Sequence, residues 1–207
     1  MSSMIFKKPI RIGPTKFKIF QWMIHIFILA WLILIFYQGL TDQLGGDPVQ
    51  SLLDFTGIGA LNLLVISLVI SPIASYLKFG QVIQLRRPIG LYSAFYALSH
   101  LMVFIAFELQ FEMVLVLSEI IERPYITVGF TTFIILSILA ITSISNIKKK
   151  MGRKWFTLHS LSYIAVILGG IHYLWLVKSA WYEPAIYIIV SMLLILLRRK
   201  KIIKMFK

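Results

Sequence analysis

The sequence predicts an all-α integral membrane protein, a bundle of six transmembrane helices with both termini in the cytoplasm. Three observations lead to this fold class: the composition, the lengths of the apolar runs and the distribution of charge. Of the 207 residues, 59% are hydrophobic, whereas soluble domains have about 45–50%. The mean hydropathy of +0.87 is also typical of a membrane protein.

Six apolar runs account for most of the chain. A spanning helix needs about 20 mostly apolar residues, and the candidates are 19–38, 57–77, 89–109, 126–147, 155–177 and 182–198. The first run is too long for the core of a signal peptide, so we expect it to be retained. The predicted organisation is a basic N-terminus (1–18), a transmembrane domain (19–198) and a basic tail (199–207).

The charges between these runs set the orientation. Nineteen of the 21 Lys and Arg residues lie in the segments 1–18, 78–88, 148–154 and 198–207. All eight acidic residues lie on the other side or at its border. Cytoplasmic loops carry the excess of Lys and Arg, so both termini are predicted to be cytoplasmic. The net charge of +13 therefore indicates membrane orientation and lipid contact, with no nucleic-acid partner.

Four histidines lie within the predicted spans: His25 on the first, His100 on the third, and His159 and His172 on the fifth. The chain has no cysteine, so histidine is its only strong nitrogen ligand for a metal. A single intramembrane histidine can simply hydrogen-bond to a neighbouring helix. Imidazoles on facing helices are also what a bis-histidine haem requires.

The histidines are predicted to lie at different depths. At a rise of ~1.5 Å per residue, His25 and His159 lie roughly 10 Å from the inner border, His100 about 20 Å and His172 roughly 28 Å. His159 and His172 are about 140° apart around an ideal helix. They share a face only if the glycine pair 169–170 distorts the helix. Otherwise His172 faces His100, and His159 faces a partner that stays open, with His25 as one candidate.

Two loop motifs add further candidates. Arg86 and Arg87 open the third span in "RRPIG", either as inside-positive anchors or as partners of an anionic group such as a haem propionate or a flavin phosphate. The stretch "GGDPVQSLLDFTG" at 45–57 combines turn residues with a part that we expect to form a short interfacial helix. No phosphate-binding loop, carboxylate pair or nucleophile elbow is present, so no catalytic residue is assigned.

Several motifs in order resemble a known family. They are "GGDPVQSLLDFTG", "SPIASYL", "RRPIGLYSAFYALSHL", "ERPYITVG" and "GRKWFTLHSLSYIAVILGGIHYLW". The chain resembles the MsrQ family (also called YedZ), the haem-binding membrane subunits of the bacterial periplasmic methionine sulfoxide reductase system, within the ferric reductase-like transmembrane group. The resemblance covers roughly residues 19–200.

The resemblance implies one or two b-type haems, and flavin mononucleotide (FMN) is associated with the family. It implies a protein of the bacterial inner membrane that takes electrons from quinol or a cytosolic flavin reductase. The electrons would pass to a periplasmic molybdopterin subunit, MsrP in this family, that reduces methionine sulfoxide and so repairs oxidised periplasmic proteins. The haem-associated histidines fall on His100, His159 and His172.

The same resemblance leaves the number of haems open. The wider ferric reductase group often has two histidines on each of two ligand helices. The third span here has only His100, with Arg87 or Met113/Val114 where a second would lie.

The sequence is compatible with three functions. The leading hypothesis is a haem electron conduit that feeds a periplasmic reductase and is not its catalytic subunit. An alternative is a ferric or cupric reductase that acts directly on metal at the outer face. A third is a non-redox transporter or scaffold subunit whose histidines only cross-link helices.

Overall fold

The computed structural model describes residues 9–177, 179 and 181–205, and these residues form helices and no strand. The elements are α1 (Pro14–Leu40), α2 (Pro48–Tyr76), the 3₁₀ helix η1 (Gly80–Leu85), α3 (Arg86–Val103), the π-helix η2 (Phe104–Glu108), α4 (Met113–Glu122), α5 (Pro124–Ile141), α6 (Ser145–Met151), α7 (Lys154–His159), α8 (Leu161–Leu176) and α9 (Tyr182–Met205).

Five helical segments of the described residues are long and apolar enough to cross a membrane: α1, α2, the continuous η1–α3–η2 segment, α5, and α7 with α8. The prediction of an all-α multi-pass membrane protein is thus confirmed. The predicted sixth span, 182–198, lies within α9, which is not among the five. The count of six spans and the cytoplasmic location of the termini stay predictions.

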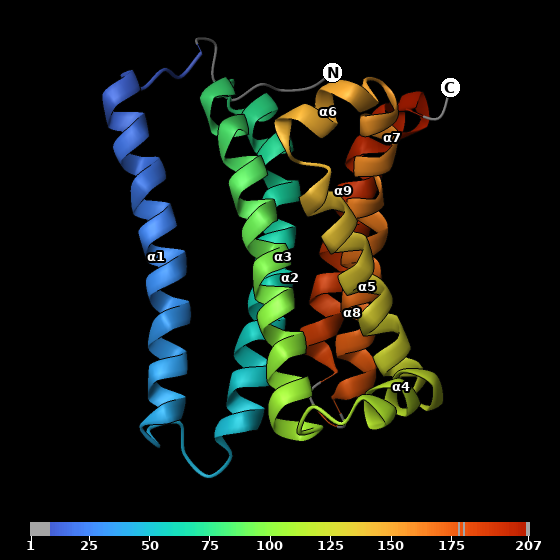
Figure 1. Ribbon diagram of the computed structural model, residues 1–207. Helices are drawn as coiled ribbons and strands as arrows, with labels where there is room; N and C mark the ends of the chain where they lie inside the picture. The colour runs from blue at the N-terminus through green and yellow to red at the C-terminus, as the bar shows by residue number, and fades with distance from the viewer. Residues whose placement is uncertain (1–8, 178, 180, 206–207) are drawn as a thin grey trace.

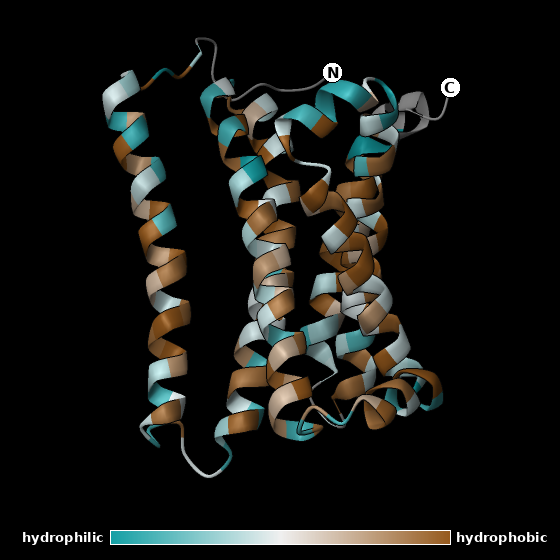
Figure 2. Cartoon of the chain, in the orientation of Figure 1, coloured by the Kyte–Doolittle hydropathy of each residue, from teal (hydrophilic) through white to brown (hydrophobic). Residues whose placement is uncertain are grey.

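The bundle has two ends of different character (Figure 1). The start of α1, the connection that contains η1, helices α6 and α7, and the end of α9 lie at one end. The α1–α2 loop, α4 and the start of α9 lie at the other. Colouring by hydropathy shows apolar residues along the middle of the helices and more hydrophilic ones toward the ends (Figure 2). This is the distribution expected of a bundle whose middle lies in lipid.

Helix α2 is the centre of the packing. Its buried leucines pack with residues of α5, α8 and α9 in one apolar cluster, whose members include Leu61, Leu64, Leu68, Leu136, Val166 and Leu194. Helix α1 stands at the side of the bundle (Figure 1). Two hydrogen bonds join it to α3: the Tyr96 hydroxyl donates to the Ile28 carbonyl at 2.7 Å, and His25 Nδ1 lies 2.7 Å from the Tyr92 hydroxyl.

The expected interfacial helix within 45–57 is wrong as a separate element. Helix α2 begins at Pro48 and runs without interruption through this stretch. Asp47 is its N-cap, because its carboxylate accepts a hydrogen bond from the Gln50 amide at 2.9 Å. Proline at the first helical position and aspartate at the N-cap both favour a helix start here. The motif residues are therefore the first turns of a spanning helix.

The fifth predicted span is interrupted at a place other than the glycine pair. Helix α7 ends at His159, and α8 starts at Leu161 after Ser160. Gly169 and Gly170 lie inside α8. A Cβ at Gly170 would lie 2.9 Å from the Ile188 side chain, so this glycine allows α9 to pack closely. The break in the helix therefore lies next to His159, between the two histidines of this span.

Candidate functional site

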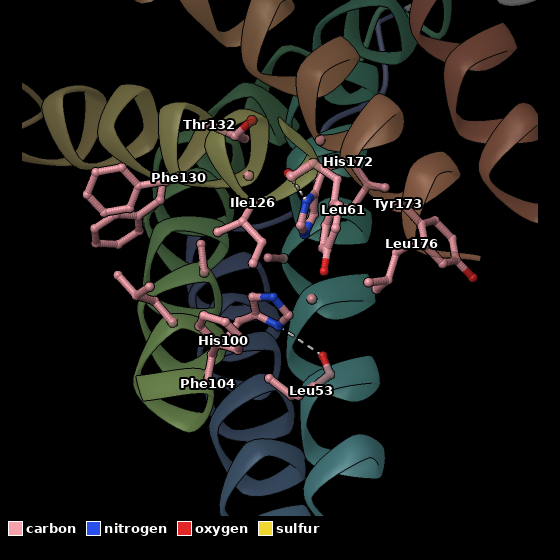
Figure 3. Close-up of a pocket in the computed structure, with 18 of the residues that line it drawn as sticks. Leu53, Leu61, His100, Phe104, Ile126, Phe130, Thr132, His172, Tyr173 and Leu176 are labelled. Carbon is pink, nitrogen blue, oxygen red and sulfur yellow. Dashed lines mark hydrogen bonds between the residues drawn. The ribbon is translucent and has the colours of Figure 1, made fainter. Parts of the chain in front are cut away.

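A cavity of about 320 Å³ lies between α2, α3, α5 and α8, with η2 and α4 at its border. Its lining is mostly apolar and includes Leu61, Phe104, Ile126 and Phe130 (Figure 3). It also includes the exposed residues Gln50, Asp54 and Glu108, so the cavity reaches the surface at the end that holds α4. Sites for small molecules and cofactors are typically apolar cavities with a few placed polar groups. Here those groups are two histidines.

His100 projects into the cavity from α3 (Figure 3). Its Nδ1 atom lies 3.0 Å from the Leu53 carbonyl of α2. One helical turn after Leu53 is Gly57, and a Cβ at that position would lie 3.0 Å from the imidazole. Because glycine has no side chain, the ring can lie against α2 and reach the Leu53 carbonyl, which also belongs to the hydrogen-bonded backbone of the helix.

His172 projects into the same cavity from α8 and is held in the same way by α5 (Figure 3). Its Nδ1 atom lies 2.7 Å from the Tyr125 carbonyl. One turn after Tyr125 is Gly129, where a Cβ would lie 2.7 Å from the imidazole. Both hydrogen bonds join residues that are 47 positions apart in the chain. The α2–α3 pair and the α5–α8 pair therefore support their histidines with one arrangement.

These hydrogen bonds fix which nitrogen of each ring is free. A carbonyl oxygen can only accept, so Nδ1 of His100 and of His172 carries the proton and donates it. In a neutral imidazole the other nitrogen, Nε2, then has a lone pair. Metal-binding histidines commonly donate their second ring nitrogen to a backbone carbonyl in this way. Both side chains are thus set to offer Nε2 to a metal.

The distance between the rings suits a shared metal ion. The ring centroids of His100 and His172 are 6.2 Å apart, with an angle of 83° between the planes. Imidazole nitrogens bind metals at about 2 Å, so two rings on opposite sides of one ion have centroids about 6 Å apart. The structure therefore brings together His100 and His172, the pair that the sequence favours when the glycine pair does not distort the fifth span.

His159 has a different environment outside this cavity. The Thr142 hydroxyl donates to the Ile138 carbonyl at 2.7 Å and lies 3.0 Å from His159 Nε2. Because the Thr142 hydroxyl proton is donated to the Ile138 carbonyl, Nε2 of His159 is the donor in this contact. The ring also stacks on Trp155, with centroids 3.9 Å apart. In this arrangement Nε2 of His159 is engaged with the protein.

The remaining predicted residues lie elsewhere. His25 is in the α1–α3 contact with Tyr92 and is not among the described residues that line the cavity. Arg86 is half-buried, and its Nη1 donates to Ser71 Oγ at 3.3 Å, whereas the neighbouring Arg87 is exposed. Neither arginine lines the cavity. The cofactor-binding roles of Arg86, Arg87 and His159 stay predictions.

Several residues of the site were not foreseen from the sequence. The carbonyls of Leu53 and Tyr125 carry no signal in the sequence, because every residue has one. Gly57 and Gly129 do carry a signal, since glycine inside a helix costs about 1 kcal/mol relative to alanine. Helix α4 lies in a segment expected to be an outer loop, and its Val116 and Ile120 border the cavity.

Comparisons with known proteins identify the class. The family model "Ferric reductase like transmembrane component" matches residues 53–170, which include His100, His159 and all the described elements from most of α2 to the middle of α8. A bundle of helices that are long and apolar enough to cross a membrane agrees with a transmembrane component. Helices α3 and α8, which carry the two cavity histidines, therefore belong to the matched region, apart from the last turns of α8 that carry His172.

Three curated relatives refine the class, and each is named protein-methionine-sulfoxide reductase heme-binding subunit MsrQ. The protein of Pasteurella multocida (strain Pm70) is 37% identical over 180 residues, 86% of this chain and 87% of its own. That of Xanthomonas euvesicatoria pv. vesicatoria (strain 85-10) is 41% identical over 162 residues, 78% and 74% of the two chains. That of Pectobacterium carotovorum subsp. carotovorum (strain PC1) is 37% identical over 188 residues, 90% and 93%. The chain belongs to the ferric reductase-like transmembrane family and, within it, to the MsrQ family.

Proposed function

We propose that the protein is a b-type haem electron-transfer subunit whose iron is held between Nε2 of His100 and Nε2 of His172. The observation that carries this proposal is the pair of imidazoles 6.2 Å apart, each with Nδ1 bonded to a backbone carbonyl. The relatives are named as heme-binding subunits of a methionine-sulfoxide reductase, which supports the choice of cofactor and of partner.

The donor set fits a haem better than a bare metal ion. Among the described residues, no group of three or more His, Cys, Asp or Glu side chains is placed to hold a metal. Two imidazoles alone provide too few ligands for a typical protein metal site. A haem would bring the other ligands of its iron with its porphyrin, and His100 and His172 would hold it. The mostly apolar lining of the cavity suits its flat apolar ring.

When bound, haem supplies one-electron oxidation and reduction. The protein contributes the positions of the ligands and the polarity around them. The Leu53 and Tyr125 carbonyls orient the two imidazoles and, as acceptors for Nδ1–H, make Nε2 a more basic ligand. Leu61, Phe104 and Phe130 exclude water from the ring, which sets the local polarity and with it the reduction potential.

The direction of electron flow follows from the proposed topology. With the basic end of the bundle in the cytoplasm, the cavity reaches the surface at the outer end. Electrons from quinol or a cytosolic flavin reductase would leave there to a periplasmic molybdopterin reductase of methionine sulfoxide. The protein is then an inner-membrane subunit of an oxidoreductase complex, and the catalytic step belongs to its partner. A second haem near His159, and bound FMN, stay predictions.

The test uses the full chain purified in a mild detergent. We expect a Soret band and an α band that respond to reduction by dithionite. We further expect the reduced protein to be reoxidised, without air, by a periplasmic methionine sulfoxide reductase of this family and its substrate. Purified protein without haem would contradict the proposal. Reoxidation by chelated ferric iron but not by the reductase would favour the metal-reductase alternative.

A further inference from the structure

A second feature, separate from the proposed haem site, is a group of Lys and Arg side chains with no acidic side chain near them. They lie at the end of the bundle that holds η1, α6, α7 and the end of α9, which we call the basic end. All eight acidic side chains of the chain lie at the other end, in or next to the α1–α2 loop, the start of α2, the η2–α4 segment and the start of α9: Asp42, Asp47, Asp54, Glu108, Glu112, Glu119, Glu122 and Glu183. The one ion pair among the described residues, Arg123–Glu119, is also at that end. No acidic side chain is therefore available to the arginines at the basic end.

Two of the arginines at the basic end are partly buried in the bundle. Arg86 of α3 donates to Ser71 Oγ of α2 at 3.3 Å, and Arg198 of α9 donates to the Tyr163 hydroxyl of α8 at 2.9 Å. Both side chains are half-buried. Arg86 lies within electrostatic range of both Tyr163 and Arg198, so four helices converge on the two guanidinium groups.

The next residue along each helix provides the contrast. Arg87 and Arg199 are exposed and serve as ordinary charges at the end of a membrane helix. Arg86 and Arg198, in comparison, lie within electrostatic range of each other in a less polar environment, and the hydrogen-bond partners found for them among the described residues are neutral hydroxyl groups. Like charges repel more strongly away from water, and removing a charge from water without a counter-charge is costly. An anion between the two guanidinium groups removes both costs.

We propose that Arg86 and Arg198 bind one phosphate group at the basic end, between α3, α8 and α9. Each guanidinium has five N–H donors in a planar fork, and that fork matches phosphate oxygens in pairs. The site lies at the level where helices leave the lipid, and basic pockets between helices on the cytoplasmic side bind lipid headgroups. The phosphate belongs either to an anionic phospholipid or to a soluble phosphate ester.

The experiment measures phosphate binding to the delipidated full chain in nonionic detergent. In one arm phosphatidylglycerol is added, with phosphatidylcholine as the zwitterionic control. In the other arm FMN is added, with riboflavin as the control without phosphate. The readouts are bound ligand per chain and the midpoint temperature of unfolding, because a ligand that binds only the folded state raises that temperature.

We expect saturable binding in one arm, and that arm identifies the source of the phosphate. Arg86→Gln and Arg198→Gln each remove a charge-assisted contact and should weaken binding by about tenfold or more. Arg199→Gln, the matched control one residue away, should change it less than about twofold. Arg198→Lys keeps the charge but loses the fork, so it should weaken binding by an intermediate factor and covers the case in which a glutamine variant fails to fold.

Three results would overturn this inference. The first is no saturable binding in either arm. The second is an equal loss in Arg199→Gln, which would indicate unspecific attraction by the basic end. The third is a loss of haem in Arg86→Gln and Arg198→Gln with phosphate binding unchanged, which would assign these arginines to a haem propionate. The proposed haem ligation at His100 and His172 would stand in the first two cases.

Discussion

The two histidines of the cavity and His159 are the same residue type in the same kind of helix, but the protein engages them through opposite nitrogens. His100 and His172 are bonded through Nδ1 to carbonyls, which leaves Nε2 directed to the cavity. His159 is bonded through Nε2 to a threonine hydroxyl and stacks on Trp155. The comparison teaches that the hydrogen bond of the second ring nitrogen decides which intramembrane histidine is ready for a metal.

The difference has a simple structural origin. At both cavity histidines a glycine lies one turn after the carbonyl that accepts the hydrogen bond, so the imidazole can lie flat against the supporting helix. His159 lies at the end of α7, next to the interruption at Ser160, and its support is a side chain. Substitutions of the histidines, of the glycines behind them and of Thr142 therefore test the comparison.

The largest effect is expected from His172→Ala set against His159→Ala. The first removes one of the two histidines proposed to hold the iron, so the haem component of the cavity should be almost completely lost. The second should leave that component unchanged. Haem per folded chain, from the reduced-minus-oxidised spectrum after size-exclusion chromatography, is the measurement. Equal loss in both variants would mean that His159 binds the same iron.

A loss of about tenfold or more in haem affinity is expected when a methyl group is added behind either imidazole. In Gly129→Ala the new Cβ lies 2.7 Å from the His172 ring, and in Gly57→Ala it lies 3.0 Å from the His100 ring, so both rings must move. Displaced ligand supports typically cost about 10–100-fold in metal affinity, and we expect the larger loss for Gly129→Ala. Haem titration of the apoprotein measures it.

Gly46→Ala is the matched control, since no atom lies within 4 Å of its added Cβ. It should bind haem as the wild type does. The glycine account would be wrong if Gly129→Ala retained full affinity, particularly because alanine in a helix is otherwise stabilising by about 1 kcal/mol.

A smaller effect, on stability alone, is expected from His159→Ala. The substitution removes the contact with Thr142 at 3.0 Å and the stacking on Trp155. Together these contacts contribute about 2 kcal/mol to the free energy of unfolding. Denaturant titration in mixed micelles gives the value. A simultaneous loss of a separate spectral component would show that a second haem uses His159.

The smallest effect is expected from Thr142→Val, which keeps the shape of the side chain but removes the acceptor for His159 Nε2. The cost should be about 1 kcal/mol of unfolding free energy, with no change in the haem of the cavity. The same titration applies. A cost equal to that of His159→Ala would mean that the stacking on Trp155 contributes nothing.

The sequence predicts the spanning segments well because length and hydropathy are local properties. Five of the six predicted runs coincide with helices that are long and apolar enough to span. The short helices α4 and α6 were missed, since each is only 10 or 7 residues long and lies in a segment that charge assigns to a loop. The start of α2 was readable from Asp47 and Pro48 but was interpreted as a turn.

The sequence singles out the histidines that line the cavity but not the groups that support them. Depth along a helix follows from counting residues and places His100 and His172 farther from the inner border than His25 and His159. The angle around an undistorted fifth helix then favours pairing His172 with His100. The interruption of the fifth span at Ser160 could not be predicted, because no glycine or proline signals it there. The carbonyls of Leu53 and Tyr125 become identifiable only when the packing of α2 on α3 and of α5 on α8 is known.

The central claim is that His100 and His172 bind one iron through Nε2, and the electron paramagnetic resonance spectrum of the oxidised protein tests it most directly. Two axial imidazoles whose planes are 83° apart should give a strongly anisotropic low-spin ferric signal. We predict this signal in the wild type and its absence in both His100→Ala and His172→Ala. Survival of the signal in either variant would contradict the claim.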